Sequence, residues 1–135
     1  MLRLSKMADY AGVVVMHIAA HPARSHTATS LADALGLPKT TVAKCLKTLA
    51  KNGVLTSQRG VNGGYMLARL PTEISIAEVI TAMDGPVKMA SCTDGHSGDC
   101  QIEKTCPMRG GWDEINADIY KLLRGKSLAD MVKQV

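Results

Sequence analysis

The chain has 135 residues, a formal net charge of +4 at pH 7, and 46% hydrophobic residues. This length predicts one domain with a substantial apolar core. No stretch approaches the ~20 consecutive apolar residues of a membrane-spanning helix, and no cleavable export signal is recognisable, so we expect neither a membrane protein nor an exported one. In the expected cytoplasmic setting the four cysteines stay reduced, which favours metal or redox roles over structural disulfides.

The charges are unevenly distributed along the chain. Residues 1–70 contain nine Lys and Arg against two Asp and Glu, whereas residues 71–135 contain seven against ten. A basic half followed by a mildly acidic half predicts a module that binds a polyanion, joined to a part with another task. An ordinary scatter of charges on a solvated surface is the alternative that charge alone leaves open.

The first part of the chain predicts a helix followed by a helix-turn-helix. An apolar run predicts a first helix over residues 5–20, which ends before Pro22. Residues 24–27 are expected to form a polar loop. Thr29 or Ser30 is then expected to cap a short second helix, and a tight glycine-containing turn leads into a third.

The third helix carries the residues that we expect to contact DNA. Apolar residues at i, i+3, i+4 and i+7 predict one buried stripe, made of Val42, Cys45, Leu46 and Leu49. In helix-turn-helix proteins the second helix of the motif enters the major groove. We expect three of its side chains to reach base edges, namely Thr40, Thr41 and Lys44. Three lysines are expected to contact phosphates, namely Lys39, Lys47 and Lys51, although a solvated helix face explains any single lysine as well.

Residues 54–68 predict a β-hairpin directly after this helix, which is typical of a wing. The expected strands are residues 54–58 and 65–68, joined by a glycine-rich turn. Arg59 lies at the expected tip, where it can reach a minor groove or the phosphates. Gly63 and its glycine neighbours would permit positive φ and a close approach of the backbone to DNA.

Two further helices are predicted after the hairpin. Residues 71–91 contain a short amphipathic helix capped by Ser75, which we expect to pack against the first helix. A longer helix starts at residue 112, with an apolar stripe made of Trp112, Ile115, Ile119, Leu122 and Leu123. Such a helix either covers its own core or pairs with a second copy, and the two-fold symmetry of operator-binding proteins favours pairing. Residues 127–131 are expected to form a short terminal helix or a tail.

Between these helices lies a polar loop that contains three of the four cysteines. Cys92, Cys100 and Cys106 have the spacing C-x7-C-x5-C, and the surrounding Gly, Asp, Ser and Thr offer them no apolar surroundings. Such thiols indicate ligand chemistry or disulfides, and we expect an iron centre. A zinc site with His96 is one alternative, although the tight C-x₂₋₄-C pairs of structural zinc are missing. Direct oxidation of Cys92 and Cys106 without a metal is another.

Together the elements predict a mainly α fold: a winged helix-turn-helix with a two-stranded β wing, a cysteine loop and a long C-terminal dimerisation helix. We expect a single domain over residues 1–135, organised as a DNA reader at 1–70, a connecting helix at 71–91, a cysteine cluster loop at 92–111 and a dimerisation helix with its tail at 112–135. The sequence shows no phosphate-binding loop, paired carboxylates or nucleophile with its base, so an enzyme is not expected.

This organisation resembles the IscR-type iron–sulfur-cluster regulators, and among them the regulators of the SUF iron–sulfur assembly system. The resemblance covers nearly the whole chain and is carried by residues 1–11, 37–38, 59–65 and 74–80 and by the cysteine triplet. It implies a homodimeric transcription regulator that binds a promoter operator in double-stranded DNA, expected to be palindromic, and controls iron–sulfur assembly genes. It also implies that Cys92, Cys100 and Cys106 hold a 2Fe–2S or 4Fe–4S cluster whose state sets DNA affinity or site choice. A zinc-binding or thiol–disulfide-sensing regulator without a cluster is the alternative function.

The resemblance leaves the fourth ligand open. In one branch a His follows the third cysteine by three residues, but this chain has Arg109 there, which cannot deprotonate to bind iron. Another branch uses an Asp at the start of the first helix, donated by the partner subunit, and Asp9 matches that position. Asp94 and His96 inside the loop are further alternatives. Asp9 is explained equally well as a first-turn residue that the helix dipole stabilises.

Overall fold

The computed structural model describes residues 3–61, 63–90, 93 and 100–132. Helices predominate, and a single antiparallel strand pair, β1-β2, forms the sheet of the described residues, which confirms the expected mainly α class. The elements are α1 (Lys6–Ala20), α2 (Ala28–Leu35), α3 (Lys39–Lys51), β1 (Leu55–Gln58), β2 (Gly64–Leu67), the 3₁₀ turn η1 (Pro71–Glu73), α4 (Ile76–Asp84), α5 (Gly111–Arg124) and α6 (Leu128–Val132).

Helix α2 begins earlier than the sequence suggests. The Thr27 hydroxyl accepts a hydrogen bond from the backbone N–H of Ser30 (3.0 Å), and the Ser30 hydroxyl accepts one from the N–H of Thr27 (3.1 Å). This reciprocal pair is a capping box, so the expected cap at Thr29 or Ser30 is wrong. The helix ends at Gly36, whose φ of 69° is left-handed.

Helix α1 lies at the centre of the fold. It contacts α2, α3, α4, α6 and β2, and its buried face joins one apolar core with α3. Leu128 of α6 is 1% exposed and belongs to that core, so the last described helix is part of the fold rather than a tail. Its segment is fixed by backbone pairing with the start of α4: Ile76 N–H donates to Lys126 O (2.8 Å) and Leu128 N–H donates to Ile74 O (2.9 Å).

The wing is attached to the segment between α1 and α2. Strands β1 and β2 pair antiparallel in the register Leu55↔Leu67 to Gln58↔Gly64. His26 and Tyr65 exchange both backbone hydrogen bonds, at 2.9 and 2.7 Å. The His26 side chain is only 2% exposed, and its Nε2 lies 3.1 Å from the carbonyl oxygen of His21. The expectation of a polar loop at residues 24–27 is therefore wrong for His26.

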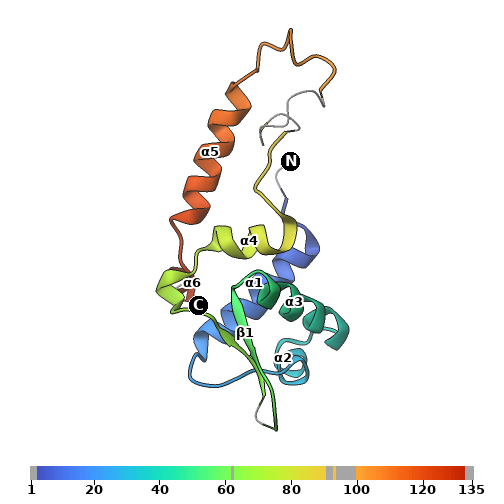
Figure 1. Cartoon of the computed structure of the whole chain (residues 1–135), viewed down its shortest axis with the longest axis vertical. Helices are drawn as coiled ribbons and strands as arrows, with labels where there is room; N and C mark the ends of the chain where they lie inside the picture. Colours follow the sequence, from blue (N-terminus) through green and yellow to red (C-terminus); the bar gives the residue numbers. More distant parts are fainter. Residues whose placement is uncertain (1–2, 62, 91–92, 94–99, 133–135) are drawn as a thin grey trace.

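Helix α4 begins at the expected cap and packs on α1 as predicted. Ser75 and Glu78 form a capping box, and the Ser5 hydroxyl at the start of α1 donates to the Asp84 carboxylate at the end of α4 (2.6 Å). Helix α5 contacts α4 and extends away from the rest, so that residues 100–110 lie at the end of the molecule opposite the wing (Figure 1). None of the helices in the described ranges is long and apolar enough to span a membrane.

Candidate nucleic-acid interface and cysteine segment

Helix α3 separates a buried face from a polar face. The four residues of its apolar stripe are 0% exposed. On the other side, Lys39, Thr40, Lys44, Lys47 and Lys51 are exposed, and Thr41 is half-buried. The polar residues that the sequence selects for DNA contact therefore lie on the solvent side of one helix. Their contacts with bases and phosphates remain predictions.

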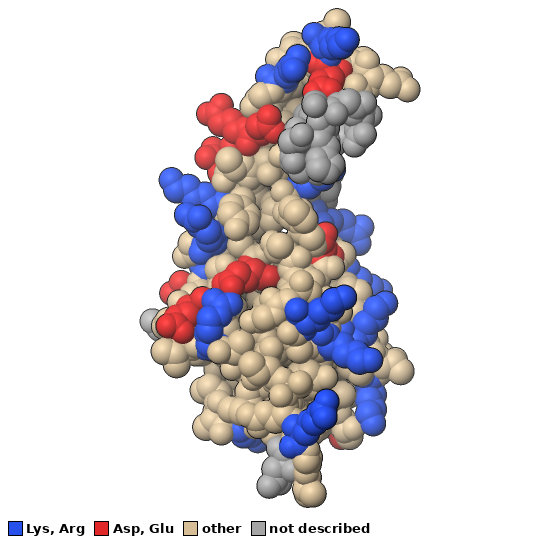
Figure 2. Space-filling model, viewed as in Figure 1, with Lys and Arg blue, Asp and Glu red and all other residues tan. Residues whose placement is uncertain are grey.

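Positive charge is denser on one side of the molecule in the view of Figure 2. Figure 2 shows Lys and Arg side chains concentrated on the side where α3 lies in Figure 1, whereas Asp and Glu are more frequent toward α4, α6 and the far end of α5. A basic surface that follows one helix is the electrostatic pattern of a nucleic-acid reader.

The geometry of the wing turn accounts for the glycine at position 63. The backbone N–H of Gly63 donates to the Gly60 carbonyl (2.9 Å), and a Cβ at position 63 would lie 2.5 Å from the Gln58 carbonyl oxygen. Glycine at position 63 is therefore required by the hairpin itself, whether or not DNA approaches it. Arg59 is exposed directly after β1. The DNA contacts of Arg59 and Gly63 remain predictions.

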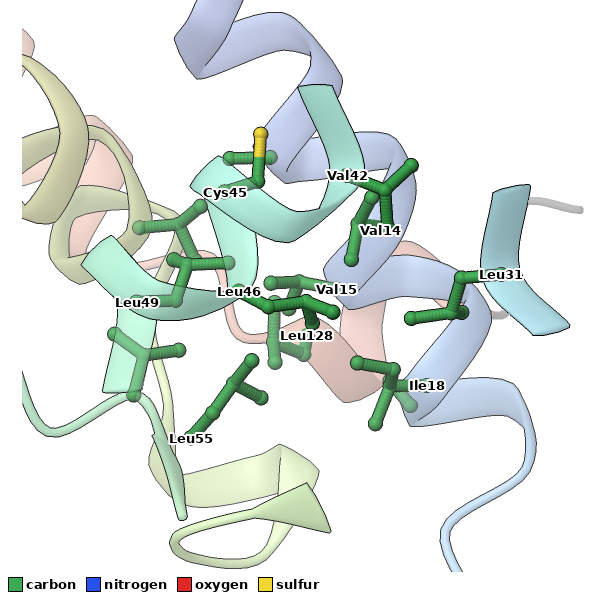
Figure 3. Close-up of a cluster of buried hydrophobic side chains, with 14 of the residues drawn as sticks. Val14, Val15, Ile18, Leu31, Val42, Cys45, Leu46, Leu49, Leu55 and Leu128 are labelled. Atoms are coloured by element: carbon green, nitrogen blue, oxygen red, sulfur yellow. The ribbon is translucent and has the colours of Figure 1, made fainter. Parts of the chain in front are cut away.

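Cys45 is a core residue, as the sequence predicts. Its side chain lies among Val42, Leu46 and Leu49 of α3 and the buried face of α1 (Figure 3). The Sγ atom lies 3.9 Å from the carbonyl oxygen of Met7. Burial raises the pKa of the Cys45 thiol more than the nearby Lys44 ammonium lowers it, which disfavours the thiolate that a metal ligand requires.

The cysteine cluster loop of residues 92–111, called the cysteine segment below, is described in part. Cys100 and Cys106 are half-buried free thiols, and each carbonyl accepts a turn hydrogen bond, from Glu103 N–H (3.3 Å) and Arg109 N–H (3.2 Å) respectively. Cys92, Asp94 and His96 lie outside the described residues. Within the described part of one chain, no three His, Cys, Asp or Glu side chains are placed to hold a metal ion.

Asp9 is exposed in the first turn of α1 and does not form such a group with Cys100 and Cys106 of its own chain. The resemblance implies that Asp9 would act as a ligand from a second subunit. That role remains a prediction.

Three histidine side chains lie close together near the start of β2, a feature that the sequence analysis missed. The ring centroids of His17, His21 and His26 lie 4.8 to 6.3 Å apart. Desolvation, and then the charges of His21, His26 and Arg24, lower the pKa of His17. The spacing of His17 and His21, four residues apart near a helix end, signals that these two share a face, but only the fold brings in His26.

Comparison with known proteins identifies relatives over the whole described fold. Residues 4–134 match the Rrf2 family, described as "Iron-dependent Transcriptional regulator". The HTH-type transcriptional regulator IscR of Xenorhabdus nematophila is 30% identical over 133 residues, covering 98% of this chain and 80% of that relative.

Two solved structures share the fold. The structure of T. potens IscR matches with a TM-score of 0.73 and 27% identity, covering 98% of this chain and 88% of that chain. The structure of CymR, the global cysteine regulator of B. subtilis, matches with a TM-score of 0.79 and 22% identity, covering 100% and 99%. The relatives are transcriptional regulators and not enzymes, which confirms the prediction from the sequence. With a winged helix-turn-helix, a basic recognition face and relatives of this kind, the chain belongs to the Rrf2 family of transcriptional regulators and is of the IscR type.

Proposed function

We propose that this regulator senses iron–sulfur status through a cluster held by Cys92, Cys100 and Cys106, and that the state of this site sets how a homodimer binds its operator. The observation that carries the proposal is the C-x7-C-x5-C triplet in a polar segment, separate from the one cysteine that the core requires. The description of the family as iron-dependent supports an iron centre. The resemblance to regulators of the SUF system supports iron–sulfur assembly genes as the genes that this regulator controls.

The donor chemistry fits the proposed group. Thiolates are the usual ligands of iron–sulfur clusters, and Cys100 and Cys106 are neither in a disulfide nor sealed in the core. When bound, such a cluster supplies redox chemistry and sensitivity to oxidants. The side chains of Gln101, Ile102 and Lys104 are exposed, so the segment lies near solvent, which suits a sensor better than an electron carrier. Asp9 of the partner subunit is the proposed fourth ligand.

The same molecule offers a DNA-reading surface at its other end. We assign base contacts to Thr40, Thr41 and Lys44, and phosphate contacts to Lys39 and Lys47. The wing adds Arg59 and Gly63. A dimer of such readers binds two half-sites on one face of a duplex, so a palindromic operator is expected.

Helix α5 supports the dimer. Trp112, Ile119 and Leu123 are half-buried against the chain's own elements, but Ile115 and Leu122 are 40% and 65% exposed. Exposed apolar side chains one turn or two apart on one helix form a stripe that a second copy can cover. The dimer would then be closed by the helix that begins directly after the cysteine segment.

The test uses anaerobically isolated protein. Wild type is expected to be coloured and to contain iron and acid-labile sulfide, whereas Cys100→Ala and Cys106→Ala lose both. Cys45→Ala is the matched control and should keep them, because its thiol lies in the core. A DNA duplex selected in vitro for tight binding to wild type should be bound with different affinity after iron removal, and this difference should vanish in Cys106→Ala.

Other results would replace the proposal with its alternatives. Stoichiometric zinc without sulfide indicates a zinc regulator. A colourless protein that forms a Cys92–Cys106 disulfide on oxidation, with a matching change in DNA affinity, indicates a thiol sensor.

A further inference from the structure

A polar side chain interrupts the inner apolar stripe of α5. Trp112, Asn116, Ile119 and Leu123 follow one another at helical spacing and are all half-buried. An apolar residue would be expected at the position of Asn116. A half-buried amide at such a position requires hydrogen-bond partners, and their identity shows what the residue does.

Asn116 holds the segment that leads into the cysteines. We call residues 85–90 the strap, because they run from the end of α4 to the cysteine segment. The Asn116 Oδ1 accepts a hydrogen bond from the backbone N–H of Met89 (2.8 Å), and its Nδ2 donates to the Val87 carbonyl (3.0 Å). An amide offers both a donor and an acceptor, so one side chain satisfies two backbone groups of the strap at once.

The strap borders a pocket on the side that faces α4 and α5. Together with Ile80, Ile119 and Leu123 it lines a cavity of about 470 Å³ between α4 and α5. The pocket is open to solvent, so close packing holds the strap against α5 less tightly on that side. The two hydrogen bonds of Asn116 make a specific link between the strap and α5.

The link lies between the two arms that carry the cysteines. Cys92 follows Met89 by three residues, and Cys106 precedes the first residue of α5 by five. On the far side of Cys92, the Thr93 hydroxyl donates to the carbonyl of Ala90 at the end of the strap (2.7 Å). The contact of Asn116 therefore joins the segment just before Cys92 to the helix just after Cys106.

We propose that Asn116 is the positioning residue that couples the cysteine segment to α5, by locking the strap to the helix through Val87 and Met89. The coupling to cluster state rests on the proposed function above, whereas the lock itself does not. By linkage, whatever the cysteines bind then changes the position of α5 and the operator affinity together.

The experiment compares Asn116→Leu with wild type and with Lys121→Leu, a polar-to-apolar change at an exposed position of the same helix. Hydrogen exchange of the Met89 amide in iron-free protein tests the lock. We expect exchange to become roughly five- to tenfold faster in Asn116→Leu and to be unchanged in Lys121→Leu. Unchanged exchange in Asn116→Leu would overturn the inference, whatever the cofactor proves to be.

The second readout tests coupling. For each protein we compare the operator Kd before and after iron removal, using the same selected duplex, and measure iron and sulfide content. Asn116→Leu is expected to bind iron and sulfide as wild type does, with the ratio of the two Kd values reduced toward one. A full wild-type ratio, or loss of the iron itself, would show that Asn116 does not transmit the signal. If wild type shows no iron, the proposed function fails while the exchange result still stands.

Should Asn116→Leu fold poorly, Asn116→Asp provides a second test of the coupling. Aspartate keeps the acceptor for Met89 but cannot donate to Val87 when it is ionised. The protection of the Met89 amide should then persist, while the ratio of the two Kd values falls toward one. A ratio equal to that of wild type would contradict the coupling.

Discussion

Gly64 fixes the root of the wing against the segment between α1 and α2. Its φ is 151°, and a Cβ at this position would lie 2.6 Å from the carbonyl oxygen of His26. Gly64→Ala should therefore lower the free energy of unfolding by about 2 kcal/mol, because the backbone is strained and the pairing of His26 with Tyr65 is pushed apart. Urea denaturation followed by circular dichroism at fixed protein concentration measures the change.

Gly12 is the matched control, since it lies within α1 and an added Cβ there meets nothing within 4 Å. Gly12→Ala should leave the free energy of unfolding unchanged or raise it by up to about 1 kcal/mol, because alanine is the better helix former. Equal destabilisation by both substitutions would contradict the steric explanation for Gly64.

His17 gives the fold a dependence on pH. Its pKa is lowered below the ordinary 6.5 by desolvation and by the charges of His21, His26 and Arg24. The folded chain therefore binds a proton at His17 less readily than the unfolded chain does. Stability is therefore full above pH 6.5 and falls as the pH decreases below that value. In His17→Gln this fall should be shallower. Denaturation midpoints between about pH 8 and pH 5 measure it, and identical profiles for the two proteins would refute the assignment.

At the scale of single elements, α5 has two apolar faces, one that packs within the chain and one that is exposed. The inner face packs toward α4, while Ile115 and Leu122 remain exposed. Leu122→Asp should leave the subunit folded and weaken self-association by at least about tenfold, since burial of one leucine contributes about 2 kcal/mol. Sedimentation equilibrium measures the dissociation constant.

Ala117→Asp adds the same charge at another exposed position of α5 and serves as the control. A dimer that tolerates Leu122→Asp as well as Ala117→Asp would show that the outer stripe of α5 is not the interface.

Local sequence signals were enough to predict several elements. The stripe of α3, the Ser75 cap of α4 and the helical spacing of α5 depend on residues within a few positions of one another, and the structure confirms these elements. The division of the α5 stripe into an inner and an outer face was not predictable, because apolar residues occupy both sides and only the placement of α4 decides between them. The role of Asn116 depends on the strap, which lies 27 residues earlier.

Features that depend on long-range backbone pairing could not be predicted. His26 is buried because β2 pairs with it, and Leu128 is buried because its segment pairs with the start of α4. Neither segment has a strand pattern of its own, so the sequence suggested a polar loop for the first and left a short helix or a tail open for the second. The early start of α2 was missed for a local reason, since the hydroxyl residues at 27, 29 and 30 are all suitable caps and only the geometry selects Thr27.

Across the whole molecule, the wing and residues 100–110 lie at opposite ends, with α4 and α5 between them (Figure 1). No described cysteine other than the buried Cys45 lies in α3 or the wing. Under the proposed function, a signal from the cysteines would alter DNA binding by changing how these helices, or two subunits, are placed. This separation predicts that changes to the reader alter DNA affinity without altering iron content.

The proposed division between phosphate and base contacts predicts distinct salt dependences for the two kinds of substitution. Each phosphate contact contributes about 0.9 to the slope of log K against log salt concentration. Lys47→Gln, which removes one exposed cation from each subunit, should therefore reduce the slope by about 2 in a dimer and weaken selected and unrelated duplexes alike. Thr40→Ala should weaken only the selected duplex, because a base contact carries sequence information and no charge. Fluorescence anisotropy over a salt series measures both. If Lys47→Gln reduced affinity for the selected duplex alone and left the slope unchanged, Lys47 would read bases, and the assignment of contacts along α3 would have to be reversed.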